Sequence, residues 1–143
     1  MIEDEYDHFT DAQDTIWPNV TLELTLGHKR THWMWFVFPV LDGVGQSPTA
    51  LFFALRDLEE ARGCLDHATL GPRLIDCAGL VLTHPDKSAR EIFGATDAYK
   101  LHNCATLFAR IWTPPNPFRD ILETFFDGTE APKTLDLLEE RST

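Results

Sequence analysis

Apolar residues recur along most of the chain at spacings of three and four, which is the pattern of one buried face of an α-helix. Ser47-Pro48 has the cap and first-turn residues of a helix start, and an apolar stripe follows it to about Asp66. Gly27, Pro85 and Gly128 stand where other stripes stop. The pattern predicts helices over residues 9–16, 18–26, 48–66, 70–83, 88–93, 96–112, 117–127 and 132–138.

Cap residues support several of these helix starts. Ser88 and Glu91 have the spacing of a capping box, in which each side chain accepts from the other residue's backbone N–H. Thr96 is the expected cap of the next helix, and Asn116-Pro117 begins another. We find no alternating strand pattern, internal repeat or low-complexity linker. We therefore expect a compact all-α domain, a single-domain bundle of seven or eight short helices.

One aromatic segment does not follow this pattern. Residues 33–39 read Trp-Met-Trp-Phe-Val-Phe-Pro, a composition typical of strands, but the segment is too short for its periodicity to decide. It fits either a buried helical turn or an extended stretch.

The length and charge narrow the class of protein. A chain of 143 residues corresponds to one domain, residues 1–143, and 43% hydrophobic residues supply its core. Twenty-three acidic residues against twelve Lys and Arg give a net charge of −11, the wrong sign for a protein that neutralises phosphate backbones. We expect no nucleic-acid partner. The acids gather near the termini, where residues 1–8 and 139–143 are ends that can fray, and we interpret them as solvated faces, with repulsion of polyanions as the alternative.

The chain lacks the signals of a membrane or secreted protein. Its longest apolar run, residues 33–41, is nine residues long and includes a proline, whereas a membrane-spanning helix needs about 20 residues. The first residues are acidic, so no signal peptide is expected. Cys64, Cys77 and Cys104 have neither a disulfide-framework nor a zinc-site spacing. We expect a cytoplasmic protein with reduced thiols, no metal, no cofactor and no membrane partner.

The most unusual segment is 29–36, which places cationic side chains beside two tryptophans in an otherwise acidic protein. Lys29 and His32 suit a phosphate or carboxylate, and the rings of Trp33 and Trp35 suit a flat ring or a cation. One interpretation is a small-molecule site. The other places both tryptophans in the core and the basic residues at the surface.

Two weaker anion-binding signals follow along the chain. Gly43, Gly45 and Ser47 form a loop that leads into a helix start, where unpaired backbone N–H groups attract phosphate. The loop lacks the third glycine of a dinucleotide motif and the lysine of a P-loop, so an ordinary turn also explains it. Arg73 stands in the first turn of an expected helix, where the helix dipole disfavours a cation. It needs a compensating partner, such as a buried carboxylate or a bound anion.

A third group of polar residues, Asp97, Lys100 and His102, shares the helix that follows residue 95. Asp97 and Lys100 are three residues apart and can pair across one turn. The functional alternative makes Asp97 or His102 a general acid or base beside a ligand. We find no Ser-His-Asp order, nucleophile elbow or H-E-x-x-H helix, so the hydrolases that carry them are not supported.

The block from Lys29 to Pro39 reads K-R-[ST]-H-W-M-W-F-x-F-P, and with it the chain resembles a bacterial conserved domain family of unknown function, sometimes mislabelled calpastatin-like. Further blocks of this family match around Arg73 and from residue 92 to Lys100. The resemblance implies a small, mainly helical cytoplasmic domain with no established activity. The sequence departs from the family pattern at residues 40, 98 and 103–105, which alters any pocket that those positions line.

The blocks also resemble, loosely, those of a bacterial N-glycosidase family that acts on ADP-ribose derivatives. This likeness implies a nucleotide or ADP-ribose-like ligand, with Asp97 or His32 as acid or base in the enzymatic version. The alternative is a non-enzymatic protein-interaction module that uses the tryptophan-rich segment, with an unknown protein partner. A third interpretation gives that segment to the core and leaves the site elsewhere. The ligand-binding candidates are Lys29, His32, Trp33, Trp35, Gly43, Gly45, Ser47, Arg73 and Lys100.

Overall fold

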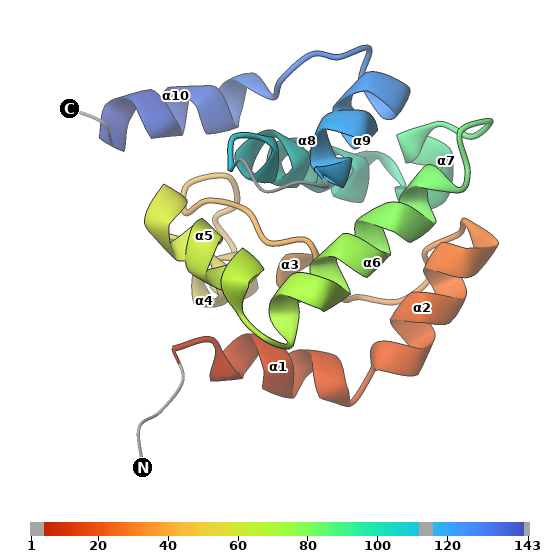
Figure 1. Cartoon of the computed structure of the whole chain (residues 1–143), viewed down its shortest axis with the longest axis horizontal. Coiled ribbons are helices and arrows are strands. Elements are labelled where there is room, and N and C mark those ends of the chain that lie inside the picture. Colours follow the sequence, from red (N-terminus) through yellow and green to blue (C-terminus); the bar gives the residue numbers. More distant parts are fainter. Residues whose placement is uncertain (1–4, 112–115, 142–143) are drawn as a thin grey trace.

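Ten helices form over residues 5–111 and 116–141, which are the residues that this computed structural model describes, and no strand is found among them. The expected all-α fold is confirmed. None of these helices has the length and apolarity to cross a lipid bilayer. The helices are α1 (Asp7–Asp14), α2 (Trp17–Leu26), α3 (Met34–Val37), α4 (Pro48–Phe53), α5 (Leu58–Asp66), α6 (Leu70–Leu82), α7 (Ala89–Phe93), α8 (Ala95–Ala109), α9 (Pro117–Phe125) and α10 (Pro132–Arg141) (Figure 1).

Most helix boundaries follow the local signals that predict them. Gly27 ends α2 in the left-handed conformation, with φ of +70°. The Ser47 side chain caps α4, and Ser88 and Glu91 form both bonds of the capping box at α7. The Asn116 side chain caps α9. Local chemistry therefore accounts for the ends of these helices.

Three expectations about helices are wrong or incomplete. The helix expected over residues 48–66 divides into α4 and α5, because Leu55 is buried and pairs with Leu41 in an isolated bridge. Thr96 is not a cap, because α8 begins at Ala95 and no side chain caps it. Helix α8 ends at Ala109, and residue 112, expected near its end, lies outside the described residues. The division of residues 48–66 and the formation of α3 raise the helix count to ten.

The aromatic segment 33–39 forms one helical turn and then extends. Its turn is α3, and Phe38 leaves the helix with φ of −120° and ψ of +78°. Trp33 and Phe38 are among the most buried large side chains of the protein. The interpretation as a buried helical turn is therefore confirmed for residues 34–37.

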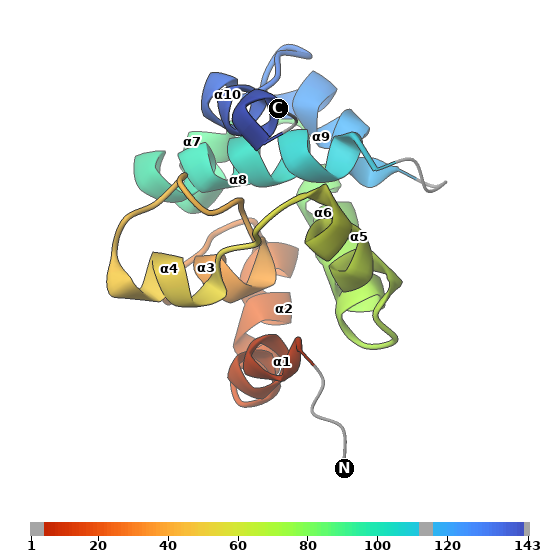
Figure 2. The same ribbon diagram turned by 90° about the vertical axis from the view of Figure 1, so that its left-hand side faces the viewer.

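Helix α8 lies at the centre of the bundle. Most of its side chains from Ala98 to Ala109 are buried, and it packs against α3, α5, α7, α9 and α10. In Figure 1, α1 and α2 lie on one side of α3, and α8 and α9 lie on the other side. Figure 2 shows α3 and α4 side by side below α8. This arrangement brings the loop after α2, the turn α3 and the start of α8 together.

Candidate functional site

A cavity of about 240 Å³ lies where α3, the start of α4 and the first turns of α8 meet the loop that follows α2. Seven residues proposed from the sequence line it: Lys29, His32, Trp33, Trp35, Ser47, Asp97 and Lys100. The fold therefore gathers side chains that are up to 71 positions apart in the chain, from Lys29 to Lys100. Met34, Phe36 and Thr49 complete the lining.

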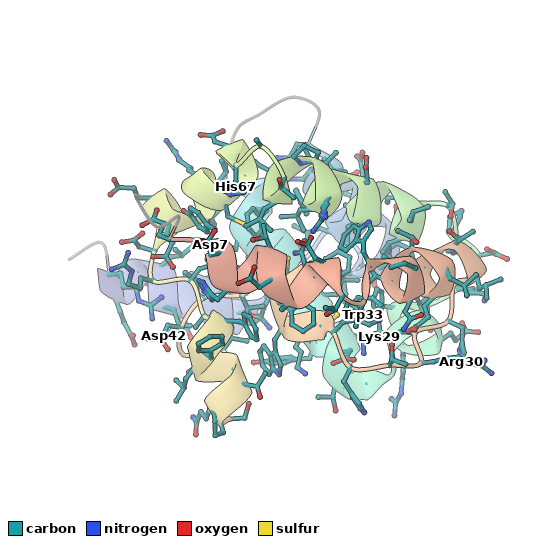
Figure 3. All side chains as sticks on the ribbon, turned by 90° about the horizontal axis from the view of Figure 1, so that it is seen from below. Asp7, Lys29, Arg30, Trp33, Asp42 and His67 are labelled. Atoms are coloured by element: carbon teal, nitrogen blue, oxygen red, sulfur yellow. The ribbon has the colours of Figure 1, made fainter. Side chains whose placement is uncertain are left out.

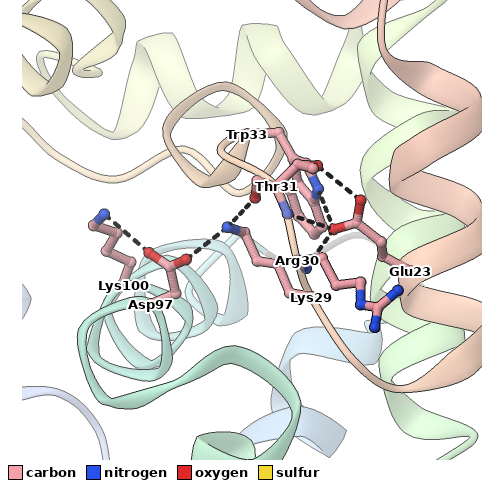
Figure 4. A network of polar contacts seen from close by, with 7 residues as sticks. All are labelled: Glu23, Lys29, Arg30, Thr31, Trp33, Asp97 and Lys100. Carbon is pink, nitrogen blue, oxygen red and sulfur yellow. Dashed lines mark hydrogen bonds and ion pairs between the residues drawn. The ribbon is translucent and has the colours of Figure 1, made fainter.

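Two ammonium groups converge on one carboxylate in this cavity. Lys29 Nζ lies 2.7 Å from Asp97 Oδ2, and Lys100 Nζ lies 3.0 Å from Asp97 Oδ1 (Figure 4). The expected pairing of Asp97 with Lys100 across one helical turn is confirmed. Asp97 is in the first turn of α8, where the helix dipole also favours an anion. The three side chains together carry a net positive charge in a protein whose overall charge is −11.

Each lysine also covers an indole ring. Lys29 Nζ lies 4.9 Å from the ring centre of Trp33, and Lys100 Nζ lies 4.0 Å from that of Trp35. Contacts of this kind stabilise by about 0.5 to 2 kcal/mol. The two indoles therefore hold the ammonium groups in place. Because each ammonium covers one face of its indole, a ligand that approaches that face contacts the ammonium first.

Asp97 is held in its ionised form. Burial by itself raises the pKa of this carboxyl, but hydrogen bonds and positive charge from Lys29 and Lys100 outweigh burial and lower the pKa. A carboxyl with a lowered pKa is a poor proton donor near neutral pH. The structure therefore favours Asp97 as a fixed negative charge over Asp97 as a general acid.

The carboxylate of Glu23, which the sequence interpretation missed, organises the loop beside the cavity. Glu23 is 6% exposed, and its Oε1 accepts from Arg30 N at 2.6 Å, Thr31 N at 3.0 Å and Trp33 Nε1 at 3.1 Å. Its Oε2 accepts from the Thr31 hydroxyl at 2.7 Å. One sequence signal for it exists, because Glu23 is the only charged residue in α2, whose other residues are apolar or uncharged.

These four hydrogen bonds decide the charge state of Glu23. Burial raises the pKa of Glu23, but the bonds from Arg30, Thr31 and Trp33 outweigh it and lower the pKa from 4.5 to about 2. Within the described residues Glu23 forms no ion pair with Lys or Arg. It is therefore a buried anion that backbone and side-chain donors stabilise.

Arg73, a candidate from the sequence, does not line the cavity. Its guanidinium lies 2.9 Å from Asp14 Oδ1, donates to Gln13 Oε1 at 3.1 Å, and lies 4.8 Å from the ring centre of Trp17. Of the two partners that the sequence left open for Arg73, the structure has a carboxylate, but that of Asp14 is 59% exposed and not buried as expected. Gln13 in turn donates to the carbonyl of Phe36 at 2.7 Å, so Arg73 is connected to α3 through Gln13.

Gly43 and Gly45 do not line the cavity either, and steric fit explains both glycines. A Cβ atom at Gly45 would lie 2.4 Å from Cη2 of Trp35, and one at Gly43, where φ is +108°, would lie 2.9 Å from Leu137 Cδ2. Gly45 therefore leaves room for the indole that forms the cavity wall. The expectation of a phosphate-binding glycine loop is not supported by these positions, although Ser47 at the end of the loop does reach the cavity.

The remaining polar candidates divide between the cavity and the rest of the fold. His32 is exposed and lines the cavity. His102 does not, because its ring stacks on Phe126 with centres 4.1 Å apart and its Nε2 is 2.8 Å from the carbonyl of Thr129. Arg30 is exposed and lies at the edge of the molecule in Figure 3, beyond Lys29 and Trp33. Within the described residues, no cluster of His, Cys, Asp and Glu could hold a metal ion.

An Arg73→Ala variant is expected to lower folding stability without changing ligand affinity. The variant removes the Arg73 donor to Oε1 of buried Gln13 and the contact with the Trp17 ring. Together these losses should lower the free energy of unfolding by about 1 to 2 kcal/mol. Thermal unfolding checks this, with exposed Arg119→Ala as the control that should change little. A large loss of ligand affinity in Arg73→Ala at unchanged stability would contradict this structural role.

Comparisons with known proteins give relatives but no activity. Residues 3–138 match the family described as "Protein of unknown function (DUF1810)". Among solved structures, the chain is similar to the crystal structure of the conserved hypothetical protein Rv1873 from Mycobacterium tuberculosis, at 43% sequence identity and a TM-score of 0.92. That match covers 94% of this chain and 96% of the other. A search of curated proteins finds no match.

Proposed function

We propose that this chain, which belongs to the DUF1810 family of proteins of unknown function, binds a small anionic ligand, a nucleotide or an ADP-ribose-like molecule, in the cavity around Lys29, Asp97 and Lys100. The observation that carries the proposal is the convergence of two lysines on one carboxylate inside a cavity. The block from Lys29 to Pro39, which the family resemblance gives as a signature, contributes six of the lining residues.

The free hydrogen-bonding capacity of the cavity favours an acceptor-rich ligand. Both oxygens of Asp97 are already bound by lysines, whereas each ammonium has three N–H donors. Lys29 uses two of them, for Asp97 and for the carbonyl of Thr31. His32 and the hydroxyl of Thr49 add further polar groups to the lining. A phosphate or carboxylate fits this set, because it accepts several charge-assisted hydrogen bonds.

The volume of the cavity limits what it can enclose. Pockets that bury a drug-sized ligand measure about 300 to 1,000 Å³, and this one measures about 240 Å³. It holds the anionic part of a nucleotide, and the rest of the ligand would extend outside. A whole dinucleotide does not fit within it.

The enzymatic version of the proposal is hydrolysis of an N-glycosidic bond. In that reaction positive charge develops on the sugar, and the net positive charge of Lys29, Asp97 and Lys100 opposes it, so the cluster suits the anionic part of the substrate rather than the reacting sugar. His32 is the lining imidazole and the better candidate for moving a proton. This version gives the acid or base chemistry to His32 and leaves Asp97 as the carboxylate that holds the two lysines.

The alternative, a protein-interaction module built on the tryptophan-rich segment, has less support. Trp33 is 1% exposed and Trp35 is partly buried, so the segment offers no broad aromatic surface. These burials favour a cavity wall over an exposed binding patch.

Binding is tested with inorganic phosphate, AMP, ADP-ribose and NAD by calorimetry and thermal shift. At a concentration of about 100 times Kd, a ligand stabilises the wild type by about 2.7 kcal/mol. Lys100→Ala is expected to weaken binding at least about 10-fold, because it removes a charge-assisted hydrogen-bond donor. Lys133→Ala, at an exposed lysine of α10, is the matched control and should bind as the wild type does. Absence of binding across the panel, or an equal loss in Lys133→Ala, would contradict the proposal.

A further inference from the structure

We infer that Glu23 is a positioning residue for this site: its carboxylate fixes Thr31 and Trp33, the two groups that hold the Lys29 ammonium on Asp97. The inference rests on the proposed function, and it assigns to a side chain outside the cavity the task of keeping the cavity ready for an anion.

A continuous line of contacts runs from Glu23 to the cavity. Glu23 accepts from both the backbone N–H and the hydroxyl of Thr31, which fixes the orientation of that residue. The carbonyl of Thr31 accepts from Lys29 Nζ at 2.5 Å, and the same ammonium lies 2.7 Å from Asp97. Figure 4 shows this line from α2 through the loop to α8. The orientation of Thr31 therefore sets the position of Lys29.

Glu23 also binds the indole ring that lies under the Lys29 ammonium. Glu23 Oε1 accepts from the indole N–H of Trp33, and Lys29 Nζ lies over that same indole. The indole is 1% exposed, so its N–H has no access to water as an alternative partner. Glu23 thus fixes two of the groups that contact the Lys29 ammonium, the Trp33 ring and the Thr31 carbonyl.

Glu23 is ionised and buried without a cation partner in the described part of the chain. A buried charge is unfavourable unless hydrogen bonds compensate it, so an apolar residue would be the simpler choice for a purely structural position. The lysine ammonium needs a fixed geometry on Asp97, and the donors of loop 30–33 converge on Glu23 to give it one. Preorganised donors of this kind are what an anion site requires.

The experiment measures the affinity of inorganic phosphate for the folded protein by calorimetry, far below the unfolding temperature. Glu23→Gln keeps the side-chain volume but replaces the Oε2 acceptor and weakens the remaining bonds, because they are no longer charge-assisted. We expect about 10-fold weaker phosphate binding, the lower end of the loss found when a residue that orients the ligands of a metal site is changed. The indole N–H resonance of Trp33 should also move upfield.

The control is Glu91→Gln, at a carboxylate that accepts from the backbone N–H of Ser88 but does not line the cavity. It should leave phosphate affinity unchanged. If Glu23 were only structural, Glu23→Gln would lower the unfolding temperature and leave the affinity of the folded protein as it was, which would overturn the inference while the proposed function stands. If the wild type itself fails to bind any anion tested, the proposed function falls and the inference with it.

Thr31→Val covers the case in which Glu23→Gln does not fold. Thr31 is exposed, so the variant should fold, and it removes only the hydroxyl that lies 2.7 Å from Oε2. Weaker phosphate binding in Thr31→Val supports the positioning role, since this side chain does not line the cavity. Unchanged binding overturns it.

Discussion

Replacing Asp97 with alanine should lower the free energy of unfolding by about 2 kcal/mol, because it removes the charged hydrogen-bond acceptor of two partly buried ammonium groups. The variant leaves two ammonium groups facing each other across the cavity. The Lys29 side chain is 5% exposed and that of Lys100 is 14% exposed, so water compensates little of their charge. Urea unfolding checks the loss, with exposed Asp136→Ala as the matched control.

The same variant gives a more specific expectation, because a bound anion can take the place of the missing carboxylate. Inorganic phosphate should stabilise Asp97→Ala more than it stabilises the wild type, since both ammonium groups are then free to donate to it. Equal stabilisation of the two proteins by phosphate would show that Lys29 and Lys100 are not the groups that bind the anion.

Between pH 5 and pH 2, protonation of Glu23 should lower the free energy of unfolding of the wild type by about 3 kcal/mol. The pKa of Glu23 is lowered to about 2 in the folded protein, so the unfolded chain takes up this proton first as the pH falls. The contribution of Glu23 is therefore complete above its ordinary pKa of 4.5 and disappears as the pH falls through about 2. Each unit of difference between the folded and unfolded pKa values corresponds to about 1.4 kcal/mol, which gives the size of this loss in the free energy of unfolding.

The measurement is urea unfolding at a series of pH values. Glu23→Gln, which has no proton to take up at this position, should lose less stability over the same range than the wild type. All other carboxyls are shared by the two proteins, Asp97 included, so the difference between the curves reports Glu23. Parallel curves would contradict the ionised, hydrogen-bonded state of Glu23.

The parts of the fold that the sequence predicted are those that local chemistry decides. The capping box at Ser88 and the left-handed glycine at Gly27 act within a single turn of the chain, and both are found. The division of residues 48–66 could not be predicted, because it depends on Leu55 pairing with Leu41 from a separate loop. Family membership of unknown function, expected from the block that begins at Lys29, is confirmed.

Only part of the candidate site was predicted, because residue type is visible in the sequence but contacts between distant residues are not. Residue types marked the segment with Lys29 and Trp35 as unusual in an acidic chain, and spacing from Asp97 marked Lys100. The fold brings these residues to one cavity. Residue type could not separate them from Arg73, whose charge is compensated by Asp14 on α1. Glu23 was missed because its importance comes from donors seven to ten residues later in the chain, which only the folded loop turns toward it.

The most direct test of the account is a titration of the isotope-labelled protein with AMP, followed by the backbone and indole N–H resonances. We expect the largest changes in the loop 29–33, in α3, at Ser47 and Thr49, and in the first turns of α8, with the indole signals of Trp33 and Trp35 among them. Changes confined to another surface, or no changes at saturating AMP and phosphate, would contradict an anion site at Lys29, Asp97 and Lys100.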